Sequence, residues 1–248
     1  MKKIIPMKYI ACFLLLVGVP LAEIHGQNDY YHVTTIRAKP GSLLDLIELI
    51  KSDIENAQAF GLQQPFLMRH SQGDHWDLLV IYPISSLGDH FRNESIVKRQ
   101  ASKTFGQPYE SSYFDLVSFQ EEQIVKGPDK SVFIEKFTKF DYYHVEIFQA
   151  LAGKRQELLK EREMENVYLK EIDRDENLIF KKVMGGEADI FTIGFYRDIK
   201  HYAESADIPI EKENEAAKKA GFESVYTIGS YLRSLILRHN DTLANAVR

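Results

Sequence analysis

The pentapeptide Asp-Tyr-Tyr-His-Val occurs at residues 29–33 and again at residues 141–145, 112 positions later. The similarity continues at the same spacing, where Gly73 aligns with Gly185. A repeat of this length exceeds the roughly 20–50 residues of solenoid units, so it indicates a duplicated domain. We therefore expect two copies of one folding unit in tandem.

Both copies have the same predicted order of elements. Segments rich in aromatic and β-branched residues indicate strands, and apolar residues at helical spacing indicate helices. The predicted strands are 30–37, 66–70, 76–82 and 113–119 in the first copy, and 142–149, 178–183, 189–196 and 226–232 in the second. The predicted helices lie around 43–54 and 96–103, and around 158–164 and 211–220. This β-α-β-β-α-β order is ferredoxin-like and places two helices on one face of a four-stranded antiparallel sheet.

The fold class that follows is α+β. The uncovered face of each sheet has to be buried, and two units in one chain achieve this by packing sheet against sheet. We divide the chain into a signal peptide (1–26), a first ferredoxin-like repeat (27–126), a linker or crossover segment (127–140), and a second repeat with a C-terminal extension (141–248). Alternation within residues 131–137 predicts a further strand there.

Residues 1–26 have the layout of a secretory signal peptide. Lys2, Lys3 and Lys8 precede an apolar run at 9–22, and a polar stretch begins at Gln27. The run is shorter than the roughly 20 residues of a transmembrane helix. We expect export to the periplasm or the cell exterior, with no membrane span after removal of the signal.

The composition excludes several classes of protein. The net charge is -5, and it becomes -7 without residues 1–26, which carry three lysines and one glutamate. Such a chain lacks the basic surface that a nucleic-acid binder needs. The only cysteine, Cys12, lies in the predicted signal, so thiol catalysis and iron–sulfur ligation are excluded. The sequence also carries no phosphate-binding loop and no nucleophile elbow.

The duplicated pattern, with its aromatic-and-histidine first strand, resembles the dimeric α/β-barrel superfamily. It looks most like the members related to antibiotic-biosynthesis monooxygenases. The resemblance covers residues 29–232 and rests on element order and duplication. It implies that both units pair their sheets into one intrachain barrel. That superfamily includes cofactor-free oxygenases and haem-binding proteins, so the resemblance leaves the cofactor open, with haem as one candidate.

Strand alternation assigns the candidate site residues. We expect Val33 and Thr35, like Val145 and Ile147, to face the helices. The opposite strand face then lines the barrel interior. The ligand-binding residues expected there, or in the third strand of the first copy, are Tyr30, His32, Trp76, Tyr142 and His144.

His144 and Glu146 are the candidates for catalysis. A neutral imidazole in the interior would act as a general base or as a ligand to haem iron. Glu146, which stands where the first copy has Thr34, would orient the ring. The alternative is that the paired histidines are hydrogen-bonded core residues shared by two similar units.

No metal site is predicted. His70 and His75 flank a turn that contains Asp74, but the second copy has no histidines there, and surface histidines in a turn are the simpler interpretation.

Three functions remain open at this stage. The leading one is an exported protein that binds a small apolar or aromatic molecule in the barrel. The others are an oxygenase-like enzyme, either cofactor-free or haem-dependent, and a structural protein with a filled barrel. Because the tandem fusion supplies both units, a monomer or a homodimer is expected.

Overall fold

The computed structural model describes residues 29–101 and 111–248, so the predicted signal peptide lies outside the described residues. The strands are β1 (Tyr30–Ala38), β2 (Phe66–Gln72), β3 (Leu78–Ile84), β4 (Val117–Lys126), β5 (Tyr142–Ala150), β6 (Leu178–Gly185), β7 (Ile190–Tyr196) and β8 (Ile236–Ala246). The helices are α1 (Leu43–Ala59), α2 (Leu87–His90), α3 (Asn93–Ala101), α4 (Ser111–Leu116), α5 (Lys130–Lys139), α6 (Arg155–Glu171), α7 (Ile199–Ala203), α8 (Ile210–Lys219) and α9 (Val225–Arg233), with a 3₁₀ turn at Glu204–Asp207. Among the described helices, none is both long and apolar enough to span a bilayer.

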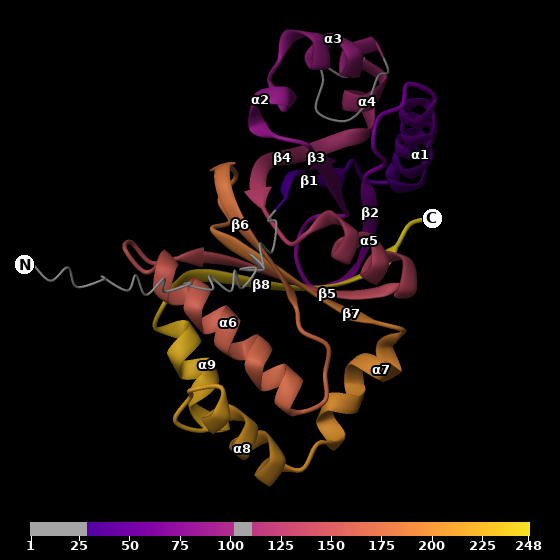
Figure 1. Ribbon diagram of the computed structural model, residues 1–248. Coiled ribbons are helices and arrows are strands. Elements are labelled where there is room, and N and C mark those ends of the chain that lie inside the picture. Colours follow the sequence, from indigo (N-terminus) through magenta and orange to yellow (C-terminus); the bar gives the residue numbers. More distant parts are fainter. Residues whose placement is uncertain (1–28, 102–110) are drawn as a thin grey trace, which may run out of the picture.

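The strands form a closed antiparallel barrel in the order β1-β3-β2-β8-β5-β7-β6-β4. Each half contributes one four-stranded ferredoxin-like sheet, and the two sheets join where β2 pairs with β8 and β4 pairs with β6. The helices of the two halves lie on opposite sides of the barrel (Figure 1). The predicted intrachain dimeric α/β barrel is therefore confirmed.

Equivalent glycines permit the two junctions between the halves. Gly73 and Gly185 have positive φ angles of 117° and 76°. A Cβ at Gly185 would lie 2.5 Å from the carbonyl oxygen of Glu122, and one at Gly73 would clash with the carbonyl oxygen of Asp241. Both the backbone conformation and the close approach therefore favour glycine.

Aromatic side chains from both halves fill one end of the barrel. Tyr31 of β1 and Phe180 of β6 meet edge to face, with ring centroids 5.5 Å apart. Phe133, on α5 between the two halves, contacts both rings and is fully buried. Helix α5 therefore closes the end of the barrel at which β1 and β5 begin.

Helix α5 replaces the strand predicted at residues 131–137. Asp129 caps the helix by accepting a hydrogen bond from the backbone N–H of Ser131 at 2.7 Å. Phe133 and Phe137, one turn apart, then lie on the same helix face and enter the core. Phe133 and Phe137 are four residues apart, and this spacing fits one face of a strand as well as one face of a helix. The sequence pattern therefore did not distinguish the two structures.

The last strand of each half also begins later than predicted. Residues 113–116 and 226–232 belong to α4 and α9, and β4 and β8 follow them. A capping box between Ser224 and Thr227 starts α9, and Ile228 and Tyr231 then pack against Phe222. The aromatic and β-branched residues that suggested a strand serve one face of an amphipathic helix.

The predicted inward and outward faces of β1 and β5 are wrong. Val33 and Val145 lie in the core shared by both halves, whereas His32 contacts His90 of α2. Both faces of these strands are covered, one by the opposite sheet and one by helices. Apolar residues therefore occur on both faces, and hydrophobic alternation does not reveal which one is interior.

Candidate functional site at the open end of the barrel

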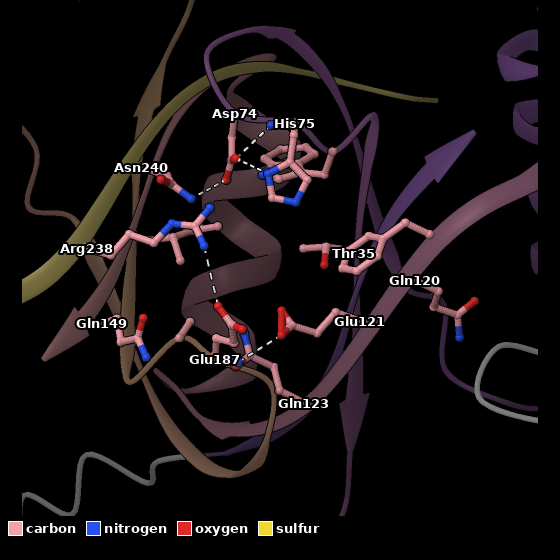
Figure 2. A pocket seen from close by; sticks show the side chains of 14 residues that line it. Thr35, Asp74, His75, Gln120, Glu121, Gln123, Gln149, Glu187, Arg238 and Asn240 are labelled. Atoms are coloured by element: carbon pink, nitrogen blue, oxygen red, sulfur yellow. Dashed lines mark hydrogen bonds and ion pairs between the residues drawn. The ribbon is translucent and has the colours of Figure 1, made fainter. Parts of the chain in front are cut away.

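A cavity of about 340 Å³ lies at the end of the barrel that α5 does not close. Strands and turns of both halves contribute its lining (Figure 2). Its lining includes Asp74, His75, Trp76, Phe119, Glu121, Ile147, Glu187, Ala188, Arg238 and Asn240. Its volume falls at the lower end of the range of small-molecule sites.

The two halves place different chemistry at equivalent positions of this cavity. Trp76 occupies the position that Ala188 has in the second half. By the pairing of β4 with β1 and of β8 with β5, Phe119 likewise corresponds to Arg238. A duplicated fold needs no such divergence for packing alone, so the cavity is a place where the two halves have diverged in chemistry.

Asp74 and His75 form a hydrogen-bonded pair on one wall. Asp74 Oδ1 lies 2.5 Å from His75 Nδ1, and its Oδ2 accepts a hydrogen bond of 2.9 Å from Asn240. The carboxylate of Asp74 is almost fully buried, whereas the imidazole is about half exposed. A buried carboxylate therefore orients an accessible imidazole, which leaves Nε2 of His75 available for a ligand.

The opposite wall carries Glu187, Glu121 and Arg238 (Figure 2). Glu121 accepts a 2.8 Å hydrogen bond from the backbone N–H of Glu187, and this fixes the β6–β7 turn. Arg238 lies 3.5 Å from the Glu187 carboxylate, but both side chains are largely exposed. The exposed ion pair is weak, so Arg238 remains able to pair with an acidic group of a ligand.

Trp76, Phe119 and Ile147 form the apolar part of the lining. Trp76 is 2% exposed, and its ring contacts His70 at a centroid distance of 5.8 Å. Its indole Nε1 is buried without a hydrogen-bond partner. An unpaired buried donor costs free energy.

Of the ligand-binding residues predicted from the sequence, Trp76 lines this cavity. Tyr30 packs with Tyr82 and Ile124 on the helix side of the first sheet. Tyr142 and His144 lie beside Tyr202 of α7, on the helix side of the second sheet. The expectation that Tyr30, His32, Tyr142 and His144 line the interior is therefore wrong. Both faces of β1 and β5 are covered, so the alternation of residues did not reveal which face is interior.

The two sequence-predicted histidines form equivalent carboxylate pairs outside the barrel. His32 Nε2 lies 3.2 Å from Glu122, and His144 Nε2 lies 3.0 Å from Asp241. Their shared positions follow from the duplication, because Glu122 on β4 and Asp241 on β8 are equivalent. Glu146 shares a strand face with His144, as predicted.

The surroundings set the protonation of this second-half pair. Burial would lower the pKa of His144, but its hydrogen bond to Asp241 and the charge of Glu146 raise it above the ordinary value. Burial would raise the pKa of Glu146, but contact with His239 and the charge of Arg162 lower it. Both groups therefore favour their charged forms.

Neither histidine fits a haem ligand. A histidine that binds haem iron needs a ring nitrogen that is free to face the metal, next to a cavity that holds the porphyrin. Here Nε2 of His32 faces Glu122, with its ring packed on His90, and Nε2 of His144 faces Asp241. We therefore derive no chemistry through haem at these positions.

The residues that sequence reasoning passed over are Asp74 and His75 as a functional pair. Their signal was present, because two histidines flank a glycine turn in one copy only. What the sequence does not show is that this turn lies over the barrel mouth beside β8, where Asn240 and Thr242 bond to Asp74.

Comparison with known proteins supports the fold. No protein-family model matches the sequence, and no curated protein matches it. Among solved structures, an anthrone oxidase-like protein is similar over 90% of this chain and 93% of its own, with 13% identity and a TM-score of 0.61. A protein proposed to be a monooxygenase, from Lactobacillus acidophilus, shares 8% identity over 89% and 94% of the chains, with a TM-score of 0.48. Chlorite dismutase from Candidatus Nitrospira defluvii shares 12% identity over 90% and 92%, with a TM-score of 0.48. The similarity to the anthrone oxidase-like protein agrees with the barrel fold described above.

Proposed function

We propose that the open end of the barrel binds a small planar aromatic molecule that carries at least one hydrogen-bonding group. The observation that carries the proposal is the cavity itself, where Trp76, Phe119 and Ile147 lie beside the Asp74–His75 pair. Apolar walls with few directed polar groups are typical of small-molecule sites. The filled aromatic end of the barrel leaves this mouth as the place for a ligand, which argues against a purely structural barrel.

The chemistry of the walls narrows the ligand class. Trp76, His75 and Arg238 all line the cavity, and the indole N–H of Trp76 has no hydrogen-bond partner. A phenolic or enolic oxygen would accept from the indole or bond to the imidazole, while its ring packs against Phe119. Aliphatic molecules without such an oxygen leave these polar groups unsatisfied.

Filling the cavity tests the proposal. Ala188 borders the cavity opposite the β2–β3 turn, so Ala188→Phe should occupy the space where a ring binds. We expect calorimetric titration with 1-naphthol to show saturable binding that Ala188→Phe weakens at least tenfold. Leu237→Phe is the matched control, because this exposed position neighbours Arg238 but lies on the other face of β8. Equal affinity in both variants would contradict the proposal.

The second candidate function is a cofactor-free, oxygenase-like reaction at the same site. The observation that favours it is the Asp74–His75 geometry, in which Nδ1 is held by the carboxylate and Nε2 can accept a proton. With anthrone, His75 would remove a proton from the ring methylene, and the resulting carbanion would reduce O₂. The balance is one anthrone and one O₂ giving anthraquinone and water. The fold shared with an anthrone oxidase-like protein supports the choice of this probe.

Oxygen uptake tests this second candidate. We expect anthrone-dependent oxygen consumption above the uncatalysed rate, reduced about 10²–10⁴-fold in His75→Gln because a general base is lost. His201→Gln, on α7 away from the cavity, should leave the rate unchanged. If the unmodified protein adds nothing to the background oxidation, the enzyme hypothesis fails while the binding proposal stands.

Export is part of the proposed function and rests on residues 1–26. Mass spectrometry of the chain recovered from a bacterial periplasm or culture medium should give an N-terminus near Gln27. Recovery of the uncleaved chain from the cytosol alone would count against export.

A further inference from the structure

Four side chains on the helix-covered face of the second sheet bring their donor atoms together, away from the barrel mouth. His144 and Glu146 come from β5, and His239 and Asp241 come from the adjacent strand β8. His144 Nε2 lies 3.0 Å from Asp241 Oδ1, and His239 Nε2 lies 3.4 Å from that same oxygen. His239 Nε2 also lies 3.5 Å from Glu146 Oε1.

These separations match those between ligands of one metal ion. Donor atoms about 2.1 Å from an ion lie about 3.0–3.4 Å apart at octahedral or tetrahedral angles. The ligand atoms of His144, Glu146 and Asp241 all lie within 4.8 Å of one another. In addition, His239 Nε2 is shielded from solvent yet makes no hydrogen bond. A histidine between two carboxylates would ordinarily form one, so this nitrogen is left available to a ligand beside the carboxylates of Glu146 and Asp241.

The surroundings of Glu146 orient one of its oxygens toward this point. Thr192 donates a 3.0 Å hydrogen bond to Glu146 Oε2, and Arg162 lies 3.6 Å from the same oxygen. Oε1 is then left facing His239. Such outer contacts, which fix a ligand's orientation, are typical of metal sites.

The charge of the cluster also favours a cation. The ion pairs that connect it within the described residues join four carboxylates to one guanidinium and two imidazoles. Arg162 is already bound through two nitrogens by Glu161, at 2.6 and 2.7 Å, and it also contacts Glu165 at 2.6 Å. Arg162 is thus shared among three carboxylates, and Glu146, which is 7% exposed, receives only its more distant contact, at 3.6 Å. Buried charge of one sign is costly unless a counter-charge is present.

The first half shows that the fold does not require these residues. At the positions of His144 and Asp241 it retains His32 and Glu122. At the positions of Glu146 and His239 it has Thr34 and Gln120, which offer no comparable pair of donors. The second half alone therefore has all four.

We propose that His144, Glu146, His239 and Asp241 bind one divalent transition-metal ion. Two imidazoles with two carboxylates suit Zn²⁺, Fe²⁺ or Mn²⁺ and distinguish the site from the all-oxygen sites of Ca²⁺ and Mg²⁺. Asp241 is 56% exposed, which gives the ion a route from solvent and room for a water ligand. This site is separate from the aromatic-ligand cavity, and its failure would leave that proposal untouched.

The experiment uses the full chain, purified without a polyhistidine tag and treated with a chelator. Zn²⁺ is titrated by calorimetry, and Co²⁺ is titrated by its visible absorption, which reports coordination directly. We expect one ion per chain, with affinity reduced at least 10-fold in Glu146→Gln and in His239→Gln. His32→Gln is the matched control, because it changes the equivalent histidine of the half that lacks the other two donors. Circular dichroism verifies that each variant is folded, and His239, being partly exposed, is the variant that depends least on the core.

The outcomes are distinct. One-to-one binding that depends on Glu146 and His239 but not on His32 supports the site. Absence of saturable Zn²⁺ and Co²⁺ binding by the unmodified chain overturns it. Binding that is unchanged in both variants, or lost equally in His32→Gln, also overturns it, because the ion would then be held elsewhere.

Discussion

His90, at the end of α2, is enclosed by groups that disfavour its positive charge. Burial, then the charges of Arg99 and His32, lower its pKa to about 4, and Glu122 opposes them only in part. Its ring lies edge-on to that of His32, at a centroid distance of 5.5 Å. In the unfolded chain the pKa of a histidine returns to about 6.5, so the unfolded state binds the proton first as the pH falls.

The stability of the fold should therefore decline with falling pH between about 6.5 and 4. At pH 5 the effect of His90 lowers the free energy of unfolding by about 2 kcal/mol, because each pH unit below 6.5 costs about 1.4 kcal/mol. Urea unfolding at pH 7.5 and pH 5.0 measures it, and His90→Gln should lose less stability between the two pH values than the unmodified protein does. An identical loss in both proteins would show that His90 is not the group responsible.

The turn of Asp74 and His75 illustrates what residue patterns convey and what they do not. The paired histidines at His32 and His144 are prominent in the sequence because the duplication repeats them. The pair in the cavity occurs once and depends on contacts with β8, which lies about 170 residues further along the chain. Repetition identified shared architecture, whereas the divergent turn provided the candidate chemistry.

At the scale of elements, α5 supplies the packing that closes one end of the barrel. Phe133 lies within 4.2–6.1 Å of the rings of Tyr31, Phe66, Phe180 and Phe195, measured between centroids. These partners come from both halves, so this one helix joins the two sheets internally.

Phe133→Ala should lower the free energy of unfolding by about 3–5 kcal/mol, because apolar burial is lost and a cavity is left behind. Ile134→Ala is the matched control on the same helix, because Ile134 is exposed and should change the free energy of unfolding by less than about 1 kcal/mol. Chemical denaturation of both variants decides the point. Similar losses for the two would mean that α5 does not depend on its inward face.

Element order was predictable from the sequence, but several boundaries were not. Duplication gave two estimates of each element, and agreement between copies at β1 and β5 or β3 and β7 made the order secure. At α4 and α9 a strand was predicted wrongly in both copies, because their aromatic and β-branched residues fit a strand as well as an amphipathic helix. The phase of β1 and β5 was indeterminate because helices and the opposite sheet bury both faces.

At the scale of the whole molecule, the halves are interlocked rather than merely adjacent. Strand β2 of the first half pairs with β8, and β4 pairs with β6, so each half completes the sheet of the other. The central core likewise contains residues of both halves. Separation of the halves would expose two sheet edges on each half, and the aromatic interior, at once.

Unfolding of the chain should therefore be a single cooperative transition. The fluorescence of Trp76, in the first half, and far-ultraviolet circular dichroism, which reports both halves, should give the same midpoint in urea. Two separated transitions would show that the halves are independently stable.

The central claim is that the barrel mouth is a binding site for a small aromatic molecule. Trp76 is the only tryptophan of the chain and lines that cavity, so its emission reports on the site directly. We predict that titration with 1-naphthol, corrected for the absorption and emission of the probe itself, changes Trp76 emission saturably. Ala188→Phe should shift this titration to at least tenfold higher probe concentration, while Leu237→Phe should leave it unchanged. Emission that stays unchanged to saturating probe, or changes equally in both variants, would contradict the account.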